Sequence, residues 1–360
     1  MNVNAEIDPA AVSDIPICSN RRPILSEISR RNFLKTSALA AGGALTGEKI
    51  FANEPKKIYG RKALVAITLD LEMARNFPNW DDTHWDFEKG NLDAVTKKYA
   101  VEAARRVKAA GGVIHFFLVG SALEQENVDW LKEIIGMGHS IGNHTYNHVY
   151  LLAQKPDEIQ FKFKRAPWLI EGKTIAEVLD ENIRMTNEAL ISRLGIRPAG
   201  FRTPGGFANG LTGREDIQNM LLKLGFKWVS GKYPAHPNSI PGVEPTPDIF
   251  DGIVKAQLAA QPFVYPTGLI EIPMSPISDV GAFRNGKWTL EQFLKAIRLS
   301  LDWAIESSAV FDFLAHPAVL SAKDPEFKTI DLICAAVKKA GDRATLVNLE
   351  AVAALVADGR

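Results

Sequence analysis

Residues 91–120, NLDAVTKKYAVEAARRVKAAGGVIHFFLVG, decide the fold class. Residues 91–112 carry apolar side chains at helical spacing, which predicts a helix with Asn91 as its N-cap and Gly111–Gly112 at its end. Residues 113–120 form a continuous β-branched and aromatic run, which is typical of a buried strand. A helix followed by a buried strand is one unit of a parallel α/β sheet.

The same alternation runs along most of the chain. We expect strands at 63–70, 113–120, 139–143, 198–204, 226–231, 269–275, 309–317 and 345–350. Most of them are followed by a helical pattern, and two loop-rich stretches, 72–90 and 232–268, interrupt the alternation. Parallel strands need long, right-handed crossovers, so these units predict either a closed barrel or an open doubly wound sheet. No G-x-G-x-x-G or Walker sequence follows the first strand, which argues against nucleotide binding.

The N-terminal segment is typical of an exported protein. Residues 29–47, SRRNFLKTSALAAGGALTG, place an arginine pair before Phe-Leu-Lys and an apolar run, as in a twin-arginine signal. An amphipathic helix with a chance arginine pair is the alternative. We expect removal of residues 1–52 and a catalytic domain over 53–360, located in the periplasm or outside the cell. The apolar run is too short for a stable membrane anchor, which needs about 20 residues.

The amino-acid composition limits the classes of binding partner that we expect. Lys and Arg together number 42, as do Asp and Glu, so the formal charge is zero and the sequence has no basic stripe. Nucleic-acid binding is therefore not expected. Only Cys334 remains after removal of the signal, so the mature domain has no intramolecular disulfide. The sequence does not indicate an oligomeric state.

Ionisable residues collect where the expected strands end. In a (β/α) barrel the carboxyl ends of the strands form one rim, and that rim carries function. A chance scatter would not favour strand ends, yet four strands contribute to the rim: Asp70, Glu72, His144, His148, Arg202 and His316.

This set predicts a metal site. Asp70 and Glu72 are two apart on a strand and point to the same side, so they repel unless they share a cation or a proton. His144 and His148 are four apart, which suits a helical turn or a tight loop. Two imidazoles and the Glu72 carboxylate make a set typical of catalytic zinc, and Asp70 is left as a base. An H-x₃-H pair alone is weak evidence, and we expect His139 and His115 to be packed, structural histidines.

The motifs GHSIGNHTYNH, TLDLE, FRTPGG and LAHP, taken in order, resemble the polysaccharide deacetylase family over about residues 60–350. This family includes chitin, peptidoglycan and acetylxylan deacetylases. The resemblance implies a distorted (β/α) barrel of about seven to eight parallel strands with surrounding helices. It also implies a groove at the strand ends and a divalent metal, usually zinc, that assists removal of an acetyl group from a carbohydrate.

The resemblance also implies roles for single residues. Asp70 corresponds to the base, and Arg202 holds its carboxylate. His316 corresponds to the general acid, and the backbone N–H of Gly205 helps to bind the oxyanion. Glu72, His144 and His148 correspond to the metal ligands. The expected substrate groove includes Trp80, Trp85 and Pro204, although a loop tryptophan is as often a hydrophobic anchor.

Three departures from the family pattern keep alternatives open. The first motif is Asp70-x-Glu72 rather than two adjacent aspartates, and glycine replaces the aromatic residue after Arg-x-Pro. The fifth strand has no aspartate to pair with His316, and Asp279 is one candidate for that task. The alternatives to a metal-dependent deacetylase are a metal-independent hydrolase of small cyclic amides and an inactive carbohydrate-binding protein.

Overall fold

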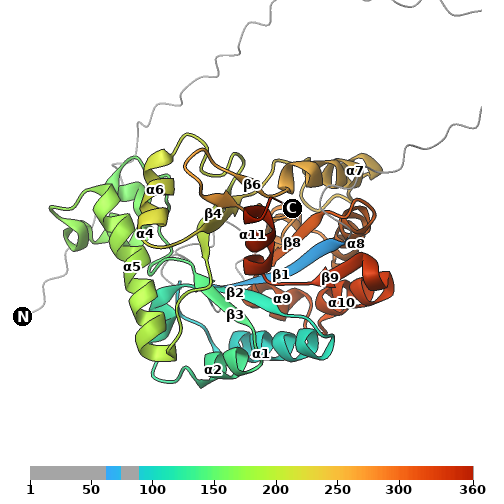
Figure 1. Cartoon of the computed structure of the whole chain (residues 1–360), viewed down its shortest axis with the longest axis horizontal. Coiled ribbons are helices and arrows are strands. Elements are labelled where there is room, and N and C mark those ends of the chain that lie inside the picture. Colours follow the sequence, from blue (N-terminus) through green and yellow to red (C-terminus); the bar gives the residue numbers. More distant parts are fainter. Residues whose placement is uncertain (1–61, 74–88, 360) are drawn as a thin grey trace, which may run out of the picture. The chain divides into compact units, whose positions relative to one another are not determined.

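A computed structural model describes residues 62–73 and 89–359. The arginine pair, Trp80 and Trp85 lie outside these residues. Figure 1 shows a curved sheet of parallel strands with helices around it. The strand order is β6-β7-β5-β4-β3-β2-β1-β8, and β9 pairs with the first part of β1. The predicted barrel class is confirmed. The barrel is distorted because the strand order ends at β6 and β7 on one side and at β8 on the other.

Among residues 62–73 and 89–359 the sheet has nine strands, which are parallel except for the antiparallel pair β6 and β7. Their bounds are β1 Ala63–Leu71, β2 Ile114–Leu118, β3 Ser140–Asn143, β4 Phe201–Phe207, β5 Trp228–Lys232, β6 Phe263–Val264, β7 Ile270–Glu271, β8 Val310–Ala315 and β9 Ala344–Leu346.

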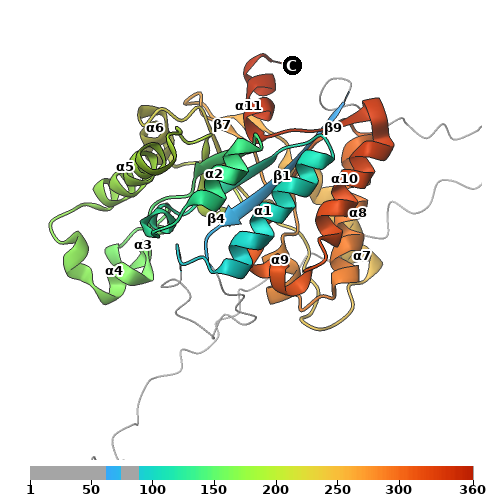
Figure 2. The same ribbon diagram turned by 90° about the horizontal axis from the view of Figure 1, so that it is seen from below.

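The helices cover the outer surface of the sheet. Figure 1 shows α5 and α6 beside one part of the sheet and α8 and α10 beside the other, and Figure 2 shows α1 and α2 between them. The α-helices are α1 Ala94–Ala109, α2 Asp129–Gly136, α3 Pro156–Ile159, α4 Phe161–Arg165, α5 Ile175–Leu194, α6 Glu215–Lys223, α7 Pro247–Ala256, α8 Leu290–Glu306, α9 Pro317–Lys323, α10 Lys328–Ala340 and α11 Leu349–Ala357. Short 3₁₀ turns lie at Gly120–Glu124, Pro167–Ile170, Gln257–Ala260 and Gly341–Arg343, and a π turn lies at Val280–Asn285.

The two faces of the strands differ in chemistry. In β1, Val65, Ile67 and Leu69 pack in the apolar cluster formed with the outer helices. The alternate residues Thr68 and Asp70 form polar contacts across the barrel interior, because side chains alternate between the two faces of a strand. The interior near the amino ends of the strands is apolar. Helix α11 closes this end, and its Leu349 packs in a cluster with strand residues. The polar side chains thus lie in the interior near the carboxyl ends of the strands, where a polar site can form.

Side chains close the sheet edge at β8. Gln261 donates to the carbonyl of Val310 and accepts from its N–H. The Ser275 backbone N–H donates to the carbonyl of Asp312 at 3.0 Å, and the Ser275 hydroxyl accepts from the Asp312 N–H. These contacts give hydrogen-bond partners to backbone N–H and C=O groups of β8, which a neighbouring strand would otherwise pair with.

Some predicted boundaries are wrong for local reasons. The N-cap of α1 is Asp93, whose side chain accepts from the Thr96 N–H, so Asn91 lies before the helix. The helix expected between the second and third strands is divided into a 3₁₀ turn and α2, with residues 125–128 between them. The strand expected over 269–275 keeps only two strand residues. Beyond them the N–H groups of Ile272 and Met274 still donate to carbonyls of β5, and the Ser275 N–H donates to Asp312 of β8.

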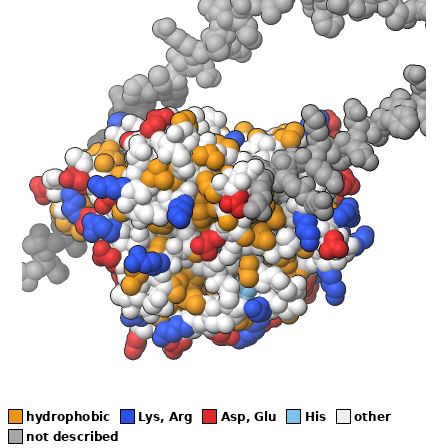
Figure 3. Space-filling model, viewed as in Figure 1, with side chains coloured by type: hydrophobic (Ala, Val, Ile, Leu, Met, Phe, Trp, Pro, Cys, Tyr) orange, Lys and Arg blue, Asp and Glu red, His pale blue; other side chains and the backbone are white. Residues whose placement is uncertain are grey.

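Charged side chains of both signs are interspersed on the face of the molecule in Figure 3. This mixture agrees with the zero formal charge of the sequence. Within residues 62–73 and 89–359, no helix has the length and apolar character that a membrane span requires.

Candidate active site

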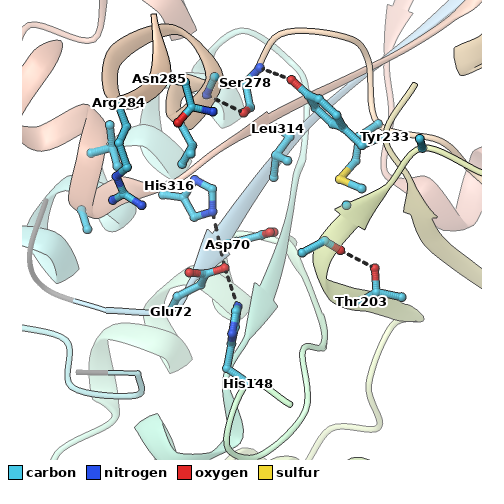
Figure 4. A pocket seen from close by; sticks show the side chains of 18 of the residues that line it. Asp70, Glu72, His148, Thr203, Tyr233, Ser278, Arg284, Asn285, Leu314 and His316 are labelled. Carbon is cyan, nitrogen blue, oxygen red and sulfur yellow. Dashed lines mark hydrogen bonds and ion pairs between the residues drawn. The ribbon is translucent and has the colours of Figure 1, made fainter. Parts of the chain in front are cut away.

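A cavity of about 510 Å³ opens where β1, β4 and β8 end. Figure 4 shows Asp70, Glu72, His148 and His316 pointing toward one another at its base. The lining includes four of the residues that the sequence placed at strand ends, namely Asp70, Glu72, His148 and His316. Gly205 also lines the cavity. The prediction that these residues meet at one rim agrees with this arrangement.

The candidate metal ligands form a compact group. Nε2 of His144 lies 3.1 Å from Oε1 of Glu72, and Nε2 of His148 lies 3.0 Å from the same oxygen. The candidate ligand atoms of the three residues lie within 4.8 Å of one another. Glu72 and His144 are buried, and His148 is nearly so.

Hydrogen bonding fixes the tautomer of His144. Its Nδ1 lies 3.0 Å from the carbonyl oxygen of Arg202. A carbonyl can only accept, so Nδ1 carries the proton and a neutral ring has its lone pair on Nε2, the atom that faces Glu72. A ligand histidine typically donates its other ring nitrogen in this way. The three side chains therefore have the chemistry and orientation that a divalent metal needs.

A tight loop, rather than a helix, presents the two histidines. Thr145 and His148 adopt left-handed backbone angles, with φ of 59° and 58°. The Thr145 hydroxyl accepts from the Val149 N–H, and Asn182 of α5 accepts from the Asn147 N–H. Such angles are costly for residues other than glycine, so tertiary contacts must hold them in place.

Arg202 lies between two carboxylates inside the barrel. Its guanidinium contacts Oδ1 of Asp70 at 3.1 Å and Oδ2 of Asp312 at 2.6 Å. The Arg202 side chain is fully buried, so these are strong, weakly screened interactions. The predicted contact between Arg202 and Asp70 agrees with this geometry, whereas the sequence reasoning missed Asp312. The signal for Asp312 was a carboxylate inside the otherwise apolar run VFDFLA.

Asp279 is the partner of His316. Its Oδ1 lies 2.9 Å from Nδ1 of His316, and its Oδ2 accepts the His316 backbone N–H at 2.6 Å. Burial lowers the pKa of His316, but the carboxylates of Asp279 and Glu72 together raise it to about 10. His316 is therefore protonated near pH 7, and its Nε2 lies 3.4 Å from Oε1 of Glu72, the centre of the candidate ligand group.

Two family profiles match this chain. The family profile described as polysaccharide deacetylase matches residues 86–227, and the profile of the twin-arginine translocation signal matches residues 27–47. No curated protein matches the chain in sequence. Residues 86–227 therefore form part of a polysaccharide deacetylase domain, whose family hydrolyses acetyl amide or ester bonds. The N-terminal signal directs export across the cytoplasmic membrane.

Solved structures share the fold of this deacetylase. A protein assigned as a polysaccharide deacetylase from Mycobacterium smegmatis has a TM-score of 0.55 and 16% identity, covering 85% of this chain and 94% of that one. A second from Pseudomonas aeruginosa PAO1 has a TM-score of 0.54 and 13% identity, covering 81% and 90%. An allantoinase has a TM-score of 0.51 and 13% identity, covering 84% and 94%. Identities this low establish a common fold.

Lys89 is part of the deacetylase site and was missed by the sequence reasoning. Its ammonium pairs with Oε2 of Glu72 and lies 3.4 Å from Nε2 of His148. Burial raises the pKa of Glu72, but Lys89 and the nearby histidines lower it further, so it lies well below its usual range. Burial and Lys89 lower the pKa of His148 to about 4, which keeps this imidazole neutral near pH 7. No pattern in the sequence distinguished Lys89 from other loop lysines.

The FRTPGG segment of the deacetylase bulges into the cavity. Arg202 pairs with Ser230 and Phe207 with Lys232, so β4 has extra residues between these two positions. Gly205 has a φ of 77°, a left-handed backbone angle that favours glycine over any residue with a side chain. The backbone of Gly205 thereby reaches the cavity wall, and Pro204 lines an adjoining depression.

His139 and His115 are structural, as predicted. Nδ1 of His139 accepts the Ile114 N–H at 2.8 Å, and burial lowers the His139 pKa to about 4. His115 stacks on Phe117 in the interior, and burial lowers its pKa to about 3. Both rings stay neutral and stabilise the packing.

Proposed function

We propose that this deacetylase is a metal-dependent enzyme that removes N- or O-linked acetyl groups from a carbohydrate outside the cytoplasm. The observation that carries the proposal is the convergence of a two-histidine–carboxylate group, a separate aspartate and a paired histidine at one cavity. Glu72, His144 and His148 would hold the metal, with zinc as the first expectation. We further propose that the mature domain starts near residue 53.

A bound divalent metal would supply Lewis-acid stabilisation of the negative charge on the acetyl carbonyl oxygen. Asp70 accepts a proton from the attacking water, and Arg202 holds the Asp70 carboxylate in place from the barrel interior. The Gly205 N–H, at the bulge of β4, adds a hydrogen bond to the developing oxyanion.

His316 completes the reaction as the acid. When the bond between the acetyl carbon and the sugar oxygen or nitrogen breaks, the leaving atom needs a proton. His316 donates it from Nε2, because Nδ1 is occupied by Asp279. The inactive binding-protein alternative was motivated by the lack of an aspartate after the fifth strand, and Asp279 removes that reason.

The cavity is suited to a sugar unit. Its volume of about 510 Å³ falls within the range of small-molecule sites. Beside the acidic and basic groups, its wall includes Tyr233, Met274 and Leu314, which offer apolar surface to a sugar ring. An acetylated oligosaccharide is therefore the proposed substrate class, with Trp80 and Trp85 as proposed groove residues.

Acetate release from acetylxylan, chitin oligomers and peptidoglycan tests the proposal. The purified protein should release acetate from at least one of them, lose activity with a chelator and regain it with Zn²⁺. His148→Ala should lose activity and metal together, whereas Asp70→Asn should lose activity and keep the metal. Normal turnover by Asp70→Asn would show that the base is assigned wrongly.

A second candidate is hydrolysis of a small cyclic amide without metal. Two observations favour it: the Lys89 ammonium provides a positive charge next to Glu72, and the fold is similar to that of an allantoinase. Full activity of the metal-free protein on cyclic amides, with silence on the three polymers, would support this candidate against the first.

A further inference from the structure

Lys89 lies directly against the proposed metal ligands. Its ammonium binds Oε2 of Glu72, and its side chain is only 1% exposed. The Gly90 backbone N–H donates to the carbonyl of Glu72 at 2.6 Å, which holds the backbone next to Lys89 beside the site. A buried lysine is uncommon unless it is paired, so the position reflects a specific interaction with Glu72.

The Lys89 ammonium and a metal ion need the same partners. A protonated lysine has three donors and no acceptor, so it cannot be a metal ligand. It uses one carboxylate oxygen of Glu72 and lies within 3.4 Å of the nitrogen that His148 would give to the metal. Two cations this close repel strongly in a buried site, because screening by water is weak there.

The positions of the three candidate ligands, Glu72, His144 and His148, do not depend on contact with Lys89. The two imidazoles converge on Oε1 of Glu72, whereas Lys89 binds Oε2. Lys89 also lines the cavity of about 510 Å³, so its flexible side chain has space to move into. Departure of the ammonium would leave Glu72, His144 and His148 in place for a metal.

We propose that Lys89 is an internal competitor for the metal, whose ammonium must leave Glu72 before a divalent cation binds. The proposal rests on the metal site of the proposed function and adds a control on its occupancy. Lys89 lowers the metal affinity, and it stabilises the Glu72 carboxylate when no metal is bound. Metal content would then depend on the free metal concentration that the exported protein meets.

The affinity for Zn²⁺ and Co²⁺ tests this directly. Chelator competition would be measured on the purified chain and on Lys89→Met, whose unbranched side chain is one atom shorter and has no charge. Lys89→Met should bind both ions at least about tenfold more tightly, within the usual range of coupling between ligands. Lys89→Arg should resemble the natural protein. Lys164→Met is the matched control, because Lys164 is exposed in α4 beside the neighbouring depression. It should leave affinity unchanged.

Thermal unfolding gives a second, independent measurement. Metal-free Lys89→Met should unfold at a lower temperature than the natural protein, because Glu72 loses its buried partner. Zn²⁺ should then raise its unfolding temperature by more than it raises that of the natural protein. Metal-free variants that unfold at the same temperature would contradict the stabilising role.

The outcomes separate this proposal from the proposed function. If the natural protein binds Zn²⁺ and Lys89→Met binds it no more tightly, the competitor proposal is wrong and metal dependence stands. If only Lys89→Met binds Zn²⁺, competition is supported in its strongest form. If neither binds metal and the natural protein still releases acetate, both proposals are wrong.

Discussion

Asp279→Asn tests the pairing on which the proposed acid depends. Asp279 is buried, and its two oxygens accept the ring Nδ1–H and the backbone N–H of His316 at 2.9 Å and 2.6 Å. Asparagine has almost the same shape, but it has no charge and only one acceptor oxygen. If that oxygen keeps the ring bond, the amide NH₂ faces the backbone N–H, and one contact is lost.

The size of the effect follows from the geometry. At an effective dielectric constant of about 20, two unit charges 2.9 Å apart attract by about 6 kcal/mol, which corresponds to about four pKa units. The amide retains part of the interaction, so we expect the His316 pKa to fall by at least about two units from about 10. The acid form exists below the pKa, so the alkaline limb of kcat/KM should move to lower pH.

The assay compares two leaving groups. An acetylated sugar needs a proton on its leaving atom, whereas the p-nitrophenolate released from p-nitrophenyl acetate does not. A His316 pKa of about 8 to 6 leaves between about a half and a hundredth of the acid form at pH 8, so Asp279→Asn should lose about 2- to 100-fold on the sugar at that pH and much less on the aryl ester. Asp324→Asn is the matched control, because Asp324 is a buried carboxylate that caps α10 through the Lys328 and Thr329 N–H groups. An unmoved alkaline limb, or equal losses on both substrates, would refute the reasoning.

Two further predictions concern stability. Arg202→Met leaves Asp70 and Asp312 buried without their cation, so the free energy of unfolding measured in urea should fall by about 3–5 kcal/mol. The control Arg214→Met removes an ion pair at the surface and should lower it by less than about 1 kcal/mol. Equal losses would contradict the role of burial. His115 has a folded pKa of about 3 against its usual 6.5, so the unfolded state takes up its proton first as pH falls. Stability should therefore drop between pH 6.5 and 3 by up to about 1.4 kcal/mol per pH unit, and His115→Gln should show a shallower drop in urea unfolding at pH 7 and 5; an unchanged pH dependence would rule this out.

Local patterns predicted the framework well. The alternation of helical and strand periods anticipated β1, β2, β3 and β8 within about two residues, because these periods are properties of neighbouring side chains. The interval between Asp70 and Glu72 placed both toward the cavity for the same reason. The boundaries failed where a cap or a distant contact decided them, as at Asp93 and in the chain after β7.

The sequence by itself determined the alternating α/β class, the export signal and the side chains that could carry the chemistry, since each depends on residues close together in the chain. The tertiary structure decided how those side chains pair. Asp279 reaches His316 from a loop 37 residues earlier, and Asp312 reaches Arg202 across the barrel over 110 residues. Lys89 reaches Glu72 because the Gly90 N–H bonds to the Glu72 carbonyl. Such contacts depend on the path of the loops in space, which no local period of the sequence encodes.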